Sequence, residues 1–250
     1  MPQVDREALE FSGDDTVWPD DSLTLTRLLA SRYSCRGYKP DQVPRPVIER
    51  MLCMAQLSAS WSNMQPWDPI ITEGEGTDRF RDALFNHAVA DYEVHGGAPD
   101  IKPDFPFPAA YPRFYQERRR EVGFQLYDSL GIAKGDRVAS GKAGLDNYNF
   151  FGAPHVLIIT TDRDLGVYGA IDCGLYLGSI LLAAESLGIG MIPQAALAVY
   201  TPFLREYFEI PEDRLIVVGA SLGYADADHP ANGFRSRRAN PRASARWATR

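Results

Sequence analysis

The stretch His155-Val-Leu-Ile-Ile-Thr-Thr-Asp162 is an almost unbroken run of aliphatic and β-branched residues. Such a run predicts a strand that is buried on both faces. Soon after it, residues 168–188 form a long apolar segment of helical length, which ends at Gly188, a suitable helix C-cap. Residues 214–223 (RLIVVGASLG) predict a final strand. These three segments indicate a sheet with an apolar helix packed against it.

Helical patterns surround this centre. Their apolar residues recur at a spacing of three to four, and one further short strand, PIIT at 69–72, follows a polar loop. Residues 96–112 are rich in glycine and proline and predict an irregular connection. The order of elements predicts an α+β domain with a small central sheet. The remaining predicted helices span residues 22–32, 46–59, 78–92, 113–130 and 201–208.

Length and composition indicate an ordinary globular chain. The 250 residues are 45% hydrophobic and 24% charged, which suits one large domain or two small ones. Three widely spaced cysteines without a CxxC motif favour a reducing compartment over a disulfide framework or a thiolate zinc site. The four scattered histidines give no metal-ligand spacing, so we expect no metal.

The N-terminus and the apolar runs bear on location. The first residues are polar and acidic, unlike a signal peptide. The longest apolar run, residues 173–184, is too short to span a membrane. We therefore expect a cytoplasmic protein that has no membrane partner.

The charge is unevenly distributed. The net charge is −7, yet the residues after Asp228 contain six arginines and no acidic residue. An acidic chain is unsuited to coating nucleic acid, so no nucleic-acid partner is expected. A local arginine cluster could still hold a small anion, because a guanidinium grips phosphate through two parallel hydrogen bonds.

One motif points to a different chemistry. The segment Gly219-Ala-Ser221-Leu-Gly223 follows an apolar strand, as a nucleophile elbow does. Turn-forming residues follow it instead of a helix, and little chain remains to supply an acid and a base. A Ser221 hydrolase is thus a remote alternative.

Three polar segments could bind a ligand. Residues 31–38 (SRYSCRGY) place two guanidiniums beside a hydroxyl, although a solvated helix end would look similar. Residues 58–67 (SASWSNMQPW) set amides beside an indole, which suits a heteroaromatic ligand with polar edges or a simple polar turn. Residues 232–238 (NGFRSRR) are either an anion site or a basic tail.

In this order, over residues 23–238, the segments resemble the FMN-dependent nitroreductase family. The resemblance also includes Ala153-Pro154 before the strand at 155–162, the apolar helix and the Pro193-Gln194-Ala195 loop. The resemblance depends on the order of these motifs, since each motif alone is unspecific. Residues 118–132 (RRREVGFQLYDSLGI) resemble the subgroup that acts on substituted nitroaromatics. The resemblance implies a nitroreductase-like fold, with a small central mixed sheet flanked by helices, in a homodimer.

The resemblance also implies a set of cofactor contacts. Residues near the FMN phosphate and ribityl chain would be Arg32, Ser34, Arg235 and Arg238, with Arg36 at the pyrimidine edge, where a cation stabilises anionic reduced flavin. Ala195 stands where glycine is frequent, and either Arg237 or Arg238 could face the phosphate, with spacing favouring Arg238. Asn63 and Gln65 could come from the partner subunit. The complete implied set is Arg32, Tyr33, Ser34, Arg36, Asn63, Gln65, Pro66, Pro193, Gln194, Ala195, Arg235 and Arg238.

The implied reaction is a ping-pong one, in which NADH or NADPH reduces FMN and a nitroaromatic or quinone is then reduced. No catalytic side chain is assigned, because the cofactor carries the chemistry. Candidate substrate contacts are Trp67, Phe124 and Tyr127, of which the last two would serve equally well in a core. Reductive dehalogenation, flavin breakdown and a flavin sensor without turnover remain alternatives.

The implied domain organisation has three parts. Residues 1–21 form an N-terminal arm, residues 22–240 the FMN-binding domain, and residues 241–250 a basic tail. Within the domain, residues 96–130 would form a variable lid.

Overall fold

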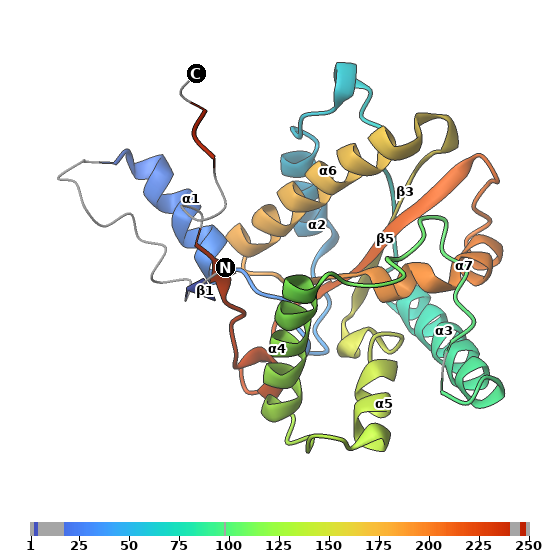
Figure 1. The fold of residues 1–250 in the computed structure, drawn as a ribbon. Coiled ribbons are helices and arrows are strands. Elements are labelled where there is room, and N and C mark those ends of the chain that lie inside the picture. The colour runs from blue at the N-terminus through green and yellow to red at the C-terminus, as the bar shows by residue number, and fades with distance from the viewer. Residues whose placement is uncertain (1–2, 5–17, 98, 241–245, 249–250) are drawn as a thin grey trace.

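Strand β3 (His155–Asp162) lies at the centre of the fold. The structure is a computed structural model that describes residues 3–4, 18–97, 99–240 and 246–248 (Figure 1). In its four-stranded sheet the order is β2-β3-β5-β4, where β2 is Asp68–Ile71, β4 is Gly190–Gln194 and β5 is Arg214–Gly223. The predicted arm and tail lie mostly outside the described residues.

All neighbouring strands of this sheet run antiparallel. We expected a mixed sheet, but among the described residues parallel pairing is confined to one isolated bridge, between Ser34 and Met191. The α+β class is confirmed. A second antiparallel pair joins β1 (Gln3–Val4) to β6 (Arg238–Ala239), so part of the N-terminal arm lies beside the basic segment at residues 232–238.

Both faces of the sheet are covered. Leu157 and Ile159 of β3 pack in one core cluster with the helices at 45–55 and 166–186. Val156 and Ile158 pack in a second cluster with the helices at 75–94 and 201–207. This alternation follows from the period of two along a strand, and it confirms that β3 is buried on both faces. The helices are α1 (Asp20–Ser31), α2 (Arg45–Ala55), α3 (Glu75–Val94), α4 (Arg113–Ser129), α5 (Arg137–Leu145), α6 (Gly166–Ser186) and α7 (Thr201–Tyr207).

Among the elements that the sequence did not predict are β4 and α5. Strand β4 contains Gly190 and Pro193, which are poor strand formers, but it is an edge strand, where proline is tolerated. Helix α5 contains two glycines and no buried residue, so it has no apolar stripe to reveal it. Its start is fixed by Asp136, whose carboxylate accepts the N–H of Ala139 at 2.9 Å.

Helix α6 requires a correction to the membrane argument. With the preceding turn it spans Arg163–Ser186, and by length and composition it could cross a membrane, unlike the shorter run considered above. It packs against β3 and α2, and 39% of its most apolar window is buried within the chain. A core helix meets the same criterion, so this feature alone does not indicate a membrane protein.

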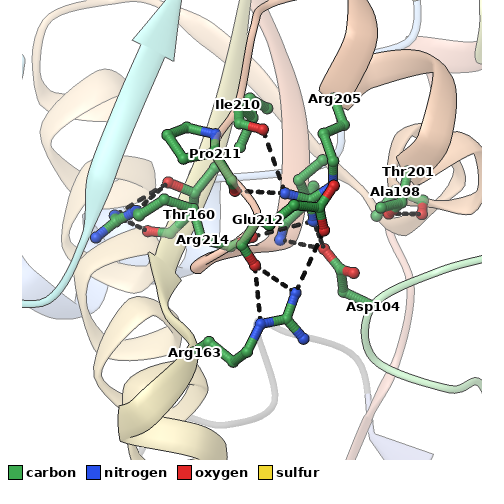
Figure 2. Close-up of polar contacts among 11 residues, drawn as sticks. Asp104, Thr160, Arg163, Ala198, Thr201, Arg205, Ile210, Pro211, Glu212 and Arg214 are labelled. Atoms are coloured by element: carbon green, nitrogen blue, oxygen red, sulfur yellow. Dashed lines mark hydrogen bonds and ion pairs between the residues drawn. The ribbon is translucent and has the colours of Figure 1, made fainter.

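Asp104 fixes the start of the predicted lid to the sheet. Its carboxylate accepts hydrogen bonds from Nη2 of Arg205 at 3.1 Å and from the N–H of Ile216 at 2.8 Å (Figure 2). Two residues earlier, the N–H of Lys102 donates to the carbonyl of Val199 at 2.9 Å. Movement of a lid would therefore have to begin after Asp104; the lid itself stays a prediction.

Candidate functional site

The first half of the site follows α1. The N–H of Arg32 bonds to Leu28 O at 3.1 Å and closes the helix, and the chain then extends along β4. There Ser34 bridges Met191, and the N–H of Cys35 donates to the carbonyl of Met191 at 3.3 Å. The edge of the sheet thus holds residues 32–36 next to the strand that ends in Pro193 and Gln194.

The second half comes from the C-terminal part of the chain. The N–H of Arg36 donates to Oδ1 of Asn232 at 2.7 Å, and the N–H of Asp226 donates to the carbonyl of Gly37 at 3.0 Å. The guanidinium of Arg235 stacks on the ring of Tyr33, 3.7 Å from its centroid. Two segments from opposite ends of the sequence are therefore joined in one site.

The site concentrates positive charge. Burial lowers the pKa of Arg32, and the nearby charge of Arg238 lowers it further. Burial likewise lowers the pKa of Arg36. Like charges that are held together and partly removed from water favour an anionic ligand, because the ligand relieves their repulsion.

The structure distinguishes Arg237 from Arg238. Nε of Arg237 donates to Oε1 of Glu121 on α4 at 2.6 Å. Nη1 of Arg238 donates to Oγ of Ser236 at 2.7 Å, and its charge acts on Arg32. Arg238 rather than Arg237 therefore belongs to the charge cluster.

At the end of β4, Gln194 points inward. Its Nε2 donates to the carbonyl of Asn147 at 3.0 Å, and its Oε1 accepts a hydrogen bond from Oγ of Ser221. Pro193 is partly exposed and Ala195 is exposed. Gln194 can thus offer only backbone groups to a ligand, while its neighbours remain accessible.

These contacts contradict the hydrolase alternative. Ser221 is fully buried within β5, where it pairs with Val156 and Ile192 on the two adjacent strands. A nucleophilic serine needs an exposed hydroxyl beside a base. Ser221 is a structural hydrogen-bond donor.

The loop with Asn63 and Gln65 lies elsewhere in the chain. Its turn η2 (Trp61–Asn63) is attached to the first half of α6, where the N–H of Trp61 donates to Asp172 at 3.1 Å. The charge of Glu185, near the other end of α6, acts on Arg32. At about 1.5 Å per residue, Asp172 and Glu185 are roughly 20 Å apart along the helix. Within one chain, Asn63, Gln65 and Pro66 therefore do not join the arginine cluster.

The predicted substrate contacts fall in different surroundings. Trp67 is only 7% exposed; its ring stacks on Tyr176 with centroids 4.6 Å apart, and its Nε1 donates to Gln56 at 3.0 Å. The indole of Trp67 therefore lies in the core of this chain, and its contact with a substrate stays a prediction. Phe124 on α4 is 44% exposed, whereas Tyr127 is partly buried.

A cavity of about 270 Å³ lies beside Arg36. Helix α4 contributes Leu126 and Leu130 to it, and Asp146 and His229 add titratable groups. None of these four residues was predicted as a site residue: Leu126 and Leu130 lie within the quoted segment 118–132, but Asp146 and His229 come from separate elements with no shared motif. Among the described residues, this cavity included, no group of three His, Cys, Asp or Glu residues could hold a metal ion.

Comparisons with known proteins identify the family of the chain. The sequence model of the nitroreductase family matches residues 29–224, most of the chain. The chain belongs to the nitroreductase family. Among relatives, it is 36% identical over 204 residues to a 4-nitrobenzoate reductase of Nocardioides sp. (strain LMS-CY), covering 81% of each protein. It is 33% identical over 215 residues to nitroreductase NfnB of Mycolicibacterium smegmatis, covering 85% of this chain and 88% of that one.

Solved structures of nitroreductases extend the agreement to the fold. The crystal structure of FMN-dependent NfnB from Mycobacterium smegmatis in complex with NADPH matches with a TM-score of 0.83 and 30% identity, covering 92% of this chain and all of that one. The family match ends at residue 224, before Arg235 and Arg238. In this nitroreductase the assignment of the C-terminal half of the site is therefore based on the contacts described above.

Proposed function

We propose that this nitroreductase is an FMN-dependent NAD(P)H oxidoreductase that reduces nitroaromatic compounds, with quinones as further acceptors. One observation carries the proposal: Arg235 stacks on Tyr33 and the charge of Arg238 acts on Arg32, in a chain whose relatives include a 4-nitrobenzoate reductase. The 4-nitrobenzoate reductase and the FMN-dependent, NADPH-bound NfnB are the relatives that support this chemistry.

The donor set fits FMN. A phosphate dianion needs several charge-assisted donors, and Arg32 and Arg238 carry like charges that act on each other, so one anion would relieve the repulsion between them. Arg235, packed on Tyr33, adds a third cation at the same end of the site. We place the phosphate and ribityl chain among these residues and Ser34.

The flavin ring would lie along the end of β4. Arg36 would face its pyrimidine edge, and Pro193, the backbone of Gln194 and Ala195 would lie near its reactive nitrogen. Bound FMN supplies the hydride-transfer chemistry. The chain's own groups bind and orient the ring, and the Arg36 cation favours its anionic reduced form. No side-chain acid or base is assigned.

We further propose a homodimer in which Asn63, Gln65 and Pro66 complete the site of the other subunit. The N-terminal half of α6 exposes apolar side chains next to this loop; among them are Val167, Tyr168, Ile171 and Leu175. A second copy covering this face would bury them and bring the loop to its arginine cluster. All three cysteines are free thiols, which suits the cytoplasm.

Nitro reduction is preferred to the other flavin chemistries considered. The relatives named above reduce nitroaromatics, whereas reductive dehalogenation, flavin breakdown and a sensor role draw no support from them. Steady oxidation of NADPH by purified protein, with 4-nitrobenzoate and with nitrobenzene as acceptors, tests the activity. Turnover that requires added or bound FMN is expected; no turnover with any nitroaromatic or quinone would reject it.

A further inference from the structure

Asn232 links the two halves of the site. It lies in the turn η6 (Pro230–Asn232) and is only 5% exposed. Its Oδ1 accepts the N–H of Arg36 at 2.7 Å, and its Nδ2 donates to the carbonyls of Gly37 at 2.9 Å and Asp226 at 2.8 Å. Both polar groups of this amide are therefore used: the oxygen binds the N–H of Arg36, and the nitrogen binds the carbonyl of Gly37.

The backbone of the same residue reaches a second cation. Nη1 of Arg235 donates to the carbonyl oxygen of Asn232 at 2.7 Å. One buried residue thus touches the segment that carries Arg36 through its side chain, and the side chain of Arg235 through its backbone. A displacement of Asn232 would move both cations.

The surrounding packing gives this link little freedom. The ring of His229 lies against Gly37, where a Cβ atom would stand only 2.2 Å from Cγ of His229. Nδ1 of His229 accepts the N–H of Ala231 at 3.3 Å, so the imidazole is held within the same turn. The turn that carries Asn232 and the residue after Arg36 are therefore packed as one unit.

We propose that Asn232 is a positioning residue for the cofactor, which sets Arg36 against the flavin edge and Arg235 toward the phosphate. The proposal rests on the function proposed above, and it adds a residue that touches neither reactant. Asn232 acts through Arg36 on the reduction potential of the flavin, and through Arg235 on the affinity for FMN.

Two substitutions of Asn232 change the hydrogen bonds of its amide to different extents. Asn232→Asp keeps an acceptor for the Arg36 N–H but replaces two donated hydrogen bonds by lone pairs facing two carbonyl oxygens. Asn232→Ser is smaller and less disruptive, so it supplies a folded protein if the aspartate variant is unstable. Thr77→Val is a matched control, because Thr77 is buried and its Oγ1 bonds to Oγ1 of Thr72 at 2.8 Å, away from both cationic segments.

The experiment measures FMN affinity of the apoprotein and the midpoint potential of the bound flavin. For Asn232→Asp and Asn232→Ser we expect FMN to bind about tenfold more weakly or worse, and the potential at saturating FMN to fall. Thr77→Val should unfold more easily than the wild type yet keep its affinity and potential. Combining Asn232→Ser with Arg36→Ala should lower the potential no further than Arg36→Ala alone.

The outcomes separate this proposal from the proposed function. Asn232 variants that lose stability but keep the wild-type affinity and potential would assign Asn232 a structural role only. Full additivity with Arg36→Ala would also overturn the proposal, because the two residues would then act independently. A wild-type protein that does not bind FMN would instead reject the proposed function itself.

Discussion

Arg237 is ion-paired with Glu121 of α4, with Nε 2.6 Å from Oε1, whereas the adjacent Arg238 acts electrostatically on Arg32. Neighbouring arginines thus serve different parts of the fold. Arg237 ties residues 235–238 to α4, and the charge of Arg238 acts on Arg32.

This difference predicts opposite results for two substitutions. Arg238→Ala should weaken FMN binding by about 1.5–3 kcal/mol for each charged hydrogen bond lost, and Arg235→Ala combined with it should release FMN. Arg237→Ala should leave the affinity nearly unchanged, since it removes a partly exposed ion pair. Fluorescence titration of each apoprotein with FMN measures this, with Arg246→Ala in the tail as control. Equal losses for Arg237 and Arg238 would contradict the assignment.

Ser221→Ala should affect stability rather than chemistry. The substitution removes the buried donor to Oε1 of Gln194, at a cost of about 1–3 kcal/mol in the free energy of unfolding. Urea unfolding followed by circular dichroism measures the loss. An esterase activity in the wild type that disappears in this variant would revive the hydrolase alternative.

His155 predicts a dependence of stability on pH. Its Nε2 accepts the N–H of Val43 at 3.0 Å, which requires that nitrogen to be unprotonated, and burial lowers the pKa of the imidazole. The unfolded chain therefore binds the proton more readily than the folded chain. The stabilisation is complete above the unfolded pKa of about 6.5 and is lost as the pH falls below it.

The comparison of wild type with His155→Gln isolates this effect from the carboxylates, which titrate in both proteins. Between about pH 7.5 and about pH 5.5, the wild type should lose more unfolding free energy than the variant. Identical pH slopes in denaturant titrations would show that His155 does not contribute.

The exposed face of α6 tests the shared site. Leu175→Arg should place a charge at the centre of the proposed contact, so the protein should become monomeric and should bind FMN weakly. Val138→Arg on α5 is the control, since Val138 is exposed on a different helix. Light scattering and FMN titration measure both effects. A monomer that still binds FMN normally would show that Asn63 and Gln65 are not supplied by a partner.

The sequence was most informative where local pattern and packing agree. The β-branched residues of 155–162 and the apolar residues of α6 predicted parts of the core, since both segments contribute buried side chains to it. The glycines of α5 and Pro193 of β4 concealed two elements that tertiary contacts stabilise. The buried position of Trp67 could not be predicted from its own motif, because its partners, Gln56 and Tyr176, come from two other segments of the chain.

The site could be predicted only in part, because some of its contacts join segments that are distant in the sequence. The arginines of residues 32–36 and 235–238 were visible as motifs, but the contact of Arg237 with Glu121 depends on how α4 lies across the basic segment. Asn232 stood within a quoted motif, yet only the structure shows its amide between Arg36 and Gly37. Residues whose role depends on contacts between distant segments leave no pattern in the local sequence.

The most direct test of the account is an anaerobic titration of the purified protein with FMN and then with NADPH. The account predicts that the protein binds FMN tightly, that NADPH bleaches the yellow colour, and that a nitroaromatic compound restores it. A protein that stays colourless in excess FMN, or a bound flavin that NADPH leaves oxidised, would contradict it.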